Sequence, residues 1–358
     1  METGVQLPTR DGKIGGLLVL YSHSMTGSIR SGLHAHARFV RSIRGYFADH
    51  GYAEVDTPCL CPYLIPEPAI EVFRTEYLSS RGAAVPLWLA PSPELWMKRL
   101  LAKGSGNIFQ ISHSFRNGDL GGPVHNPEFR LLEWYTTGAG YLDTIGVTED
   151  LFSRLLSENT PGRPREQLAP PFLRMSMEEA FRRFAGIELA ECQDAQKMKD
   201  AGIRQGVTMP ADPTWEEAFH IVFLTLVEPG LPRSRPLILT DYPARVPTTA
   251  RRKPGTPWAE RWELYIDGVE IANCYTEETE PGALKVLVKE EAERKKGCRV
   301  PHRIDEGLAD IFPTGFPSCS GAALGVDRLE MVFNGDRSLR GVILFPLSAI
   351  LDGQSETP

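Results

Sequence analysis

Two glutamates flank a tight turn in the segment ELYIDGVEI. The Asp-Gly pair at 267–268 is a strong signal for a two-residue hairpin, which places Tyr265 opposite Glu270. Opposed residues share a face, as do residues two apart on one strand, so we expect Glu263 and Glu270 to be diagonal neighbours. Two such carboxylates can bridge a divalent cation, and Mg²⁺ accepts one or two carboxylates together with phosphate oxygens. The pattern indicates a metal–nucleotide site, with two solvated glutamates on an exposed hairpin as the alternative.

Further polar residues follow on the same predicted strand. Asn273, Tyr275 and Glu277 alternate along the chain, so they share one face. Glu270 is an odd number of residues away from them. All four side chains can therefore line one pocket only if the strand bulges or twists near Ala272.

Two arginines are candidate phosphate ligands, because a guanidinium offers a fixed fork of donors and keeps its charge. Arg116 precedes a glycine-rich loop in FRNGDLGGPVHNPEFRLLEWY, and Arg328 follows small residues in SGAALGVDRLEMVF, where a ligand can approach the backbone. The glycines match neither a P-loop nor a dinucleotide-binding fingerprint, and a lone helical arginine often forms only a surface ion pair. His125, in the same loop, either contacts phosphate or caps the loop.

Several elements are needed to position these residues. Helical spacing runs from Leu33 to Phe47, and a second helix starts at Ser92, a plausible N-cap, and ends at Gly104. Residues 108–116 and 128–135 read as antiparallel strands joined by the glycine-rich loop. Strand patterns return at 236–243, 261–277 and 341–347, with a charged helix at 283–297.

Residues from about 140 to 235 differ in character. They contain capping-box starts at Ser176 to Glu179 and at Thr214 to Glu217, each before a helical pattern. This segment is expected to be a helical insertion. The whole pattern predicts an α+β fold, with an antiparallel sheet flanked by helices.

Composition limits the function classes. The 358 residues, 42% hydrophobic, can bury a large core, and a net charge of −7 gives no global field that favours long nucleic acid. The apolar run at 15–21 is too short to span a bilayer and has no clear cleavage site, so we expect a cytoplasmic protein without a membrane partner. The six scattered cysteines indicate ordinary thiols in a reducing compartment.

In their order along the chain, these segments resemble the three motifs of class II aminoacyl-tRNA synthetase catalytic domains. The helix and strand ending at Pro58 resemble motif 1, FRNGDLGGPVHNPEFRLLEWY motif 2, and GAALGVDRLEMVF motif 3. SPELWMKRLL, HNPEF with LEWY, and ELYIDGVEIANCYTE are similar to the lysyl-tRNA synthetase subgroup. The resemblance implies a catalytic domain over 29–350, with the insertion at about 140–235, after an N-terminal arm at 1–28.

The resemblance also implies roles for individual residues. Arg116 would meet the α-phosphate of ATP, Phe129 would stack on adenine, and Arg328 would meet the terminal phosphate. Asn117, Asp119 and His125 are further candidates for contacting ATP, and Glu263 and Glu270 would hold Mg²⁺, with Glu263 also near ATP. The implied lysine pocket comprises Ser92, Glu94, Glu133, Tyr135, Asn273, Tyr275, Glu277 and Ala323.

The implied chemistry is adenylation, in which the amino acid's carboxylate attacks the α-phosphorus of ATP and pyrophosphate leaves. Only about thirty residues precede the first helix, so no OB anticodon-binding domain and no anticodon recognition are expected. With Ala323 where lysyl-tRNA synthetases usually have glycine, the sequence resembles the elongation factor P–lysine ligase family. That family transfers lysine, preferably (R)-β-lysine, to a lysine side chain of elongation factor P.

Two alternatives remain open from the sequence. One is a minimal enzyme that charges tRNA or a small acceptor. The other is an inactive paralogue that binds lysine or its adenylate, which the unusual GGPV segment before His125 keeps in view. For the ligase and for both alternatives we expect a homodimer, because motif 1 builds the subunit interface in this class.

Overall fold

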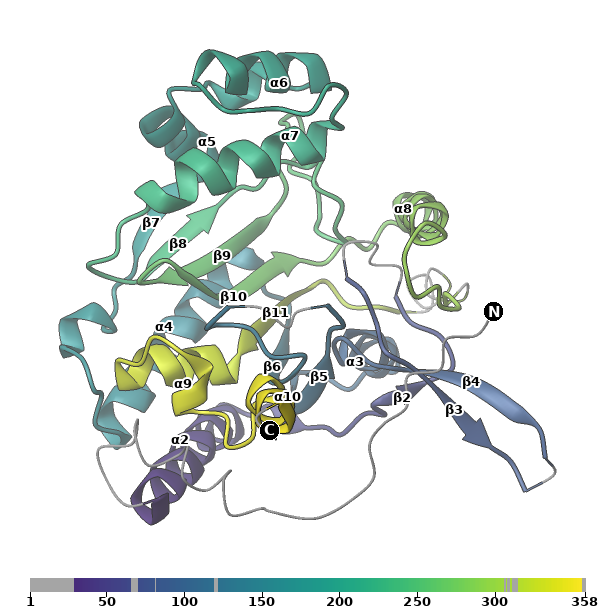
Figure 1. Cartoon of the computed structure of the whole chain (residues 1–358), viewed down its shortest axis with the longest axis vertical. Coiled ribbons are helices and arrows are strands. Elements are labelled where there is room, and N and C mark those ends of the chain that lie inside the picture. The colour runs from purple at the N-terminus through teal and green to yellow at the C-terminus, as the bar shows by residue number, and fades with distance from the viewer. Residues whose placement is uncertain are drawn as a thin grey trace.

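The computed structural model describes residues 29–65, 70–80, 82–118, 122–305, 307, 310 and 315–355. Within this part of the chain an eight-stranded sheet has the order β1-β5-β6-β11-β10-β9-β8-β7 (Figure 1). Its strands are β1 (Ala53–Glu54), β5 (Ile108–Phe115), β6 (Glu128–Thr137), β7 (Leu173–Ser176), β8 (Leu237–Thr240), β9 (Arg261–Ile266), β10 (Val269–Thr276) and β11 (Cys319–Gly325). The central pairs are antiparallel, whereas β1–β5 and β7–β8 at the edges are parallel. The α+β class is confirmed, with a sheet that is mixed at its edges.

Three helices pack together with the centre of this sheet in the largest hydrophobic core: α2 (Ile29–Asp49), α4 (Tyr141–Glu158) and α9 (Val326–Asn334). The predicted apolar spacing of the first helix is the reason for its packing. Ile43 and Phe47 are fully buried, and the Phe47 ring stacks on Phe109 of β5 at 4.9 Å between centroids. The helix ends before Gly51, whose φ of 78° suits glycine.

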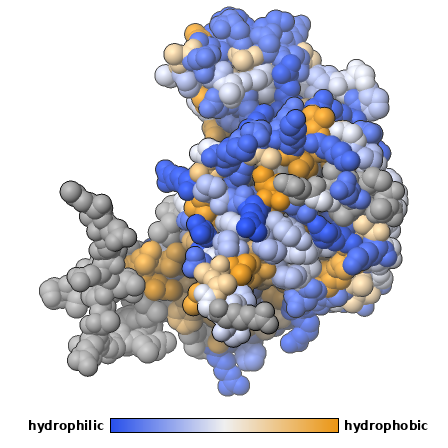
Figure 2. Space-filling model, turned by 90° about the vertical axis from the view of Figure 1, so that its right-hand side faces the viewer, coloured by the Kyte–Doolittle hydropathy of each residue, from blue (hydrophilic) through white to orange (hydrophobic). Residues whose placement is uncertain are grey.

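A second core joins the strands β7, β8 and β9 to the helices of the lobe at the top of Figure 1, which contains α5 (Met177–Ala180), α6 (Ala195–Arg204) and α7 (Trp215–Val222). Both predicted capping residues cap a helix, since Ser176 accepts from the Glu179 amide at 3.1 Å and Thr214 from the Glu217 amide at 3.2 Å. On the face in Figure 2, hydrophilic residues cover most of this lobe. The segment of about 140–235, which was expected to be one helical insertion, therefore contributes to both cores. Its first helix, α4, packs in the first core, whereas α5, α6 and α7 pack in the second.

Smaller elements surround one end of the sheet. The strands β2 (Leu60–Cys61), β4 (Ala84–Leu89) and β3 (Arg74–Leu78) form a second sheet whose β3–β4 hairpin projects from the body (Figure 1). The helices α3 (Glu94–Leu101), α8 (Pro281–Lys295) and α10 (Leu347–Ser355) complete the α-helices in the described part of the chain. Short 3₁₀ turns occur at Arg165–Gln167, Leu189–Glu191, Glu228–Gly230 and Leu339–Gly341, and π turns at Phe181–Ala185 and Phe223–Val227.

The prediction of a strand at 341–347 is wrong. This segment leaves a 3₁₀ turn, runs irregularly, and enters α10 at Leu347. Val342 and Ile343 pack against the first core, and Pro346, which has no N–H to donate to a ladder, precedes the helix. The apolar run therefore reflects packing and not strand pairing. None of the helices in the described part of the chain is long and apolar enough to cross a membrane.

Candidate active site

The bulge that the sequence requires near Ala272 is present. Glu270 faces Tyr265, as the hairpin signal predicts, whereas Ala272 faces Leu264, so the register shifts between these two pairs. The turn residues at 267–268 have φ values of 54° and 78°, as a type I′ turn requires. The extra residue in β10 is what allows Glu270 to share a face with the residues beyond the bulge.

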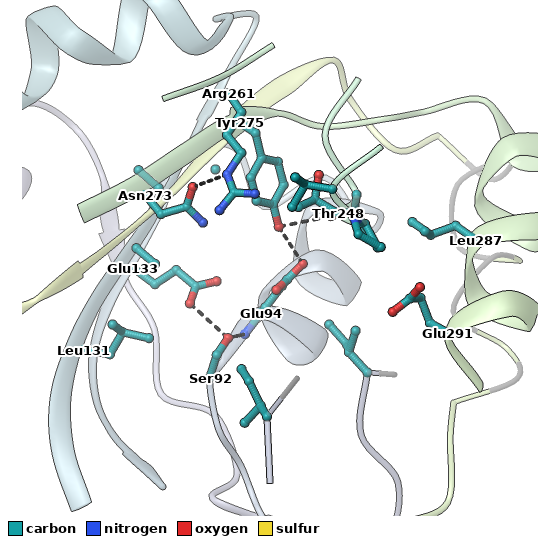
Figure 3. A pocket seen from close by; sticks show the side chains of 18 of the residues that line it. Ser92, Glu94, Leu131, Glu133, Thr248, Arg261, Asn273, Tyr275, Leu287 and Glu291 are labelled. Carbon is teal, nitrogen blue, oxygen red and sulfur yellow. Dashed lines mark hydrogen bonds between the residues drawn. The ribbon is translucent and has the colours of Figure 1, made fainter. Parts of the chain in front are cut away.

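The central strands align polar residues in two neighbouring rows across one face of the sheet. Pairing places Glu133, Ala323, Asn273 and Glu263 in one row, and Tyr135, Gly321, Tyr275 and Arg261 in the other. Seven of these eight residues, all but Glu263, line a cavity of about 320 Å³, part of which Figure 3 shows. Residues in the two rows are two apart on each strand, which is why they share a face.

The start of α3 closes one side of the cavity. Ser92 Oγ accepts a hydrogen bond from the Glu94 amide at 3.0 Å and donates to Glu133 Oε2 at 3.2 Å (Figure 3). The Tyr135 hydroxyl donates to Glu133 Oε1 at 3.0 Å. Burial, with the nearby charge of Glu94, raises the pKa of Glu133 to about 8, although the two hydroxyl donors oppose the shift. A cationic ligand at this carboxyl would favour its ionised form.

A buried ion network lies next to these residues. Lys98 Nζ contacts Glu94 Oε1 at 2.5 Å, Glu277 Oε2 at 2.9 Å and Thr249 Oγ1 at 3.0 Å. The Tyr275 hydroxyl donates to the same Glu94 oxygen at 2.9 Å. Burial raises the pKa of Glu277 to about 7 despite the charge of Lys98. The Glu277 side chain is 0% exposed and is not among the residues that line the cavity.

Glu263 and Glu270 lie at the other end of the rows, as the hairpin pattern predicts. Glu263 Oε2 accepts from the hydroxyls of Tyr242 at 2.5 Å and Tyr265 at 2.7 Å, and Oε1 accepts from Arg261 at 2.7 Å. Burial and the charge of Glu263 raise the pKa of Glu270 to about 7, while nearby arginines oppose this shift. The two carboxyl groups thus repel each other in a partly dry environment.

This pair fits a divalent cation. None of the described residues donates a hydrogen bond to the Glu270 carboxylate, and Glu263 Oε1 accepts a single one, so oxygen lone pairs remain for a metal. Hard carboxylate oxygens are what Mg²⁺ prefers. No group of three or more His, Cys, Asp or Glu in the described part of the chain could hold a metal, so the remaining ligands would come from phosphate or water.

Both predicted arginines lie near this pair, because Arg328 and Arg116 are among the charges that lower the pKa of Glu270. The Arg116 guanidinium stands over the Phe129 ring at 5.3 Å, and its buried Nε has no hydrogen-bond partner among the described residues. Arg328 donates to the carbonyls of Val124 at 3.1 Å and Glu270 at 3.2 Å. Arg116, Phe129 and Arg328 therefore approach one end of the two rows.

Two further candidates of the glycine-rich loop, Asn117 and His125, make contacts away from the cavity. Asn117 donates from its side chain to the Val72 carbonyl at 3.3 Å, so its amide fixes the loop. His125 is exposed and lines a separate hollow with Asn126 and Arg340. Asp119 lies outside the described residues. The structure thus does not bring His125 to the cavity.

Some residues of the site were missed from the sequence. Arg261 lines the cavity and donates to Asn273 Oδ1 at 2.9 Å. The sequence gives only a weak signal for it: Arg261 stands two residues before Glu263 on the same strand, so the two share a face. Lys98 lies one helical turn after Glu94, a spacing that predicts contact. Gly321 is required by close approach, because a Cβ there would lie 2.5 Å from Tyr135 Cε1.

Residues 20–349 match the profile of the family described as tRNA synthetases class II (D, K and N), so the chain belongs to that family of ATP-using enzymes. Within it, the chain is a member of the elongation factor P–(R)-β-lysine ligase family. Such a ligase from Pasteurella multocida is 33% identical over 317 residues, which cover 87% of this chain and 93% of that protein. A homologue from Aquifex aeolicus is 34% identical over 301 residues, covering 84% and 94%.

A lysine–tRNA ligase from Pelotomaculum thermopropionicum is also similar, at 33% identity over 322 residues. This match covers 87% of the chain but spans 62% of the length of that relative. The recognition made from the motifs is confirmed at the level of family and fold.

Proposed function

We propose that this chain activates lysine or (R)-β-lysine with ATP and transfers it to a lysine side chain of elongation factor P. One observation carries the proposal: two acids, the partly buried Glu94 and the buried Glu133, face a cavity that also holds Arg116. A substrate with two amines and a carboxylate needs that charge pattern. Relatives matched over 93% to 94% of their length are an elongation factor P–(R)-β-lysine ligase and a homologue of one, which supports this acceptor.

In this proposal the amino acid lies across β10 and β11. Glu94 and Glu133 bind its amines, and Ser92, Tyr135 and Tyr275 hold those carboxylates in place through the contacts described above. Asn273 contributes its amide, and Ala323 limits the space between Glu133 and Asn273, to which it is directly paired. An added methyl in such a pocket can decide which isomer fits.

We further propose that ATP occupies the region of Arg116, Phe129 and Arg328. Phe129 stacks on adenine, while Arg116 and Arg328 neutralise charge on the phosphates. Glu263 and Glu270 would hold Mg²⁺, which when bound would neutralise phosphate charge that develops as pyrophosphate leaves. Orientation and electrostatics then drive adenylate formation, and no enzyme nucleophile is needed.

In the transfer step, the deprotonated ε-amine of the acceptor lysine attacks the carbonyl of the adenylate. A carbon–nitrogen bond forms, AMP leaves, and the product is an amide.

We also propose that the active species is a homodimer. Light scattering at micromolar concentration tests this proposal, and a monomer would contradict it.

The experiment is the intact mass of purified elongation factor P after incubation with this chain, ATP, Mg²⁺ and either (R)-β-lysine or α-lysine. One added lysyl mass, lost with Arg116→Ala, is the expected result. No mass change while lysine-dependent ATP–pyrophosphate exchange persists would reject this acceptor, and tRNA would be tested next because of the lysine–tRNA ligase relative. Absence of exchange would favour an inactive binding protein.

A further inference from the structure

A second wall of the cavity carries acids of its own. This α7–α8 wall consists of Glu216 and His220 from α7 and of Leu287, Val288 and Glu291 from α8. Figure 3 shows Leu287 and Glu291 extending from α8 into the cavity, across from Glu133. The proposed activation of the amino acid uses none of the side chains of the α7–α8 wall.

Glu291 is the more enclosed acid of this wall. Its side chain is 7% exposed, and none of the described residues donates a hydrogen bond to its carboxylate. Arg294 Nη1 lies 3.3 Å from Glu291 Oε1, which leaves Oε2 open to a ligand. Burial raises the pKa of Glu291, and the charges of Glu216 and Glu290 act in the same direction. A cation in the cavity would favour the ionised carboxylate and would be bound in return.

The α7–α8 wall also keeps a negative charge. Arg294 Nη1 lies 3.3 Å from Glu216 Oε2 as well, so one guanidinium serves two carboxylates and joins α7 to α8. The Arg294 side chain is 49% exposed, so water weakens both contacts. Burial lowers the pKa of His220, so its imidazole is neutral near pH 7. One carboxylate charge therefore remains for a ligand.

Apolar side chains lie beside Glu291. Leu287 and Val288 precede it by four and three residues, so the three side chains share one face of α8. Ile65 and Ile70 line the same cavity. An aliphatic chain that ends in an ammonium group fits this pattern, because its methylene groups leave water while its charge meets a carboxylate. The phosphates of a nucleic acid do not fit it, because they would face the acids.

We infer that Glu216 and Glu291 bind the ammonium group of the acceptor, so the acceptor is a primary amine on an aliphatic stem and not a tRNA hydroxyl. This rests on the proposed function and deepens it. Glu94 and Glu133 receive the amino acid on one side of the cavity, and the α7–α8 wall receives the acceptor on the other.

The transfer step follows from this placement. The acceptor ammonium releases one proton to solvent through the Glu291 carboxylate, and the free amine attacks the carbonyl carbon of the adenylate. The carbon–nitrogen bond forms, the bond from that carbon to the phosphate oxygen breaks, and AMP leaves. The nitrogen loses its second proton to solvent as the amide forms.

The test separates the two half-reactions in Glu291→Gln. Lysine-dependent ATP–pyrophosphate exchange needs no acceptor, so its lysine KM and kcat should stay within threefold of the unaltered values. Transfer to elongation factor P and to the small amine Nα-acetyl-lysine methylamide, both followed by mass, should show an acceptor KM at least tenfold higher. Glu290→Gln removes the same charge from an exposed position next to Glu291, outside the cavity lining, and as the matched control should change neither reaction.

A second readout isolates the charge of the acceptor. Nα-acetyl-lysine methylamide should compete with elongation factor P at least tenfold better than its analogue with a hydroxyl in place of the ε-amine. Glu291→Gln should reduce this preference to less than threefold. An effect of Glu291→Gln that is equal for the amine and the hydroxyl analogue would overturn the inference, because Glu291 would then only shape the cavity.

Other outcomes would also overturn it. A higher lysine KM in the exchange assay would mean that Glu291 binds the amino acid, and an unchanged acceptor KM would mean that it does not bind the acceptor. Transfer to tRNA instead of to either amine would have the same consequence.

Failure of the proposed function gives a different pattern. If elongation factor P gains no mass while exchange persists, the proposed acceptor is wrong, and transfer to the small amine still decides the role of Glu291. If exchange is absent as well, calorimetric binding of the small amine decides it. No binding to the unaltered chain, or equal binding to Glu291→Gln, would then overturn the inference.

Discussion

Replacing Glu133 by glutamine should stabilise the protein while weakening lysine binding. Glu133 is 3% exposed, and burial raises the pKa of its carboxyl from 4.5 to about 8. Because the folded protein holds the proton more tightly than the unfolded chain, ionisation destabilises the fold progressively as pH rises from 4.5 to about 8. The cost is about 1.4 kcal/mol per pH unit in that window, or about 3 kcal/mol at pH 7.

Glutamine cannot ionise and keeps an oxygen that accepts from Tyr135. Urea denaturation at several pH values gives the free energy of unfolding of Glu133→Gln and of the unaltered protein. The advantage of Glu133→Gln over the unaltered protein should therefore grow between pH 5 and pH 8. The loss of a hydrogen bond to a charged amine is about 1.5–3 kcal/mol, so the lysine KM should rise about 10- to 150-fold. A stability difference that is the same at both pH values would refute the reasoning.

Two other changes test the packing around the site, and a third tests a helix cap. Gly321→Ala places a Cβ 2.5 Å from the Tyr135 ring and 2.9 Å from Glu277. We therefore expect a loss of about 1–3 kcal/mol in the free energy of unfolding, together with a loss of lysine-dependent exchange. Normal exchange would contradict the close packing. Ala323→Gly should raise the ratio of kcat/KM for α-lysine to that for (R)-β-lysine about tenfold, and an unchanged ratio would exclude Ala323 from isomer choice. Thr214→Ala should cost about 1 kcal/mol in denaturation without changing the lysine KM, because it removes the exposed cap of α7, a helix that packs in the second core.

Local sequence patterns predicted the parts of the site that depend on strand period and turn type. The Asp-Gly pair at 267–268 determined the hairpin register, and the odd spacing between Glu270 and Asn273 required the bulge that the structure contains. These features follow from alternation along a strand, which is a short-range property. The candidate residues on β6, β10 and β11 lie together for the same reason.

Long-range packing could not be read in this way. Lys98 looks like an exposed helical lysine in the sequence, and its burial depends on Glu277 and Thr249, which lie far along the chain. The apolar run before Leu347 resembles a strand, but Val342 and Ile343 pack against the first core, a contact that the local pattern does not reveal. The parallel pairing of β7 with β8 likewise joins segments separated by the helices of the upper lobe.

The cavity itself arises from the composition of one strand. β11 lies between β6 and β10 and presents Gly321 and Ala323 to the cavity face, while its neighbours present carboxylates, an amide and hydroxyls. Small residues in the middle of the two rows leave space above the sheet, and the polar side chains on both sides surround that space. Because adjacent strands lie about 4.8 Å apart, Glu133 and Glu263 in the same row are separated by about 14 Å. In the proposed function, an extended lysine and the phosphates of ATP would fit side by side over three strand intervals, so the proposed amine recognition and the proposed metal pair can share one face of one sheet.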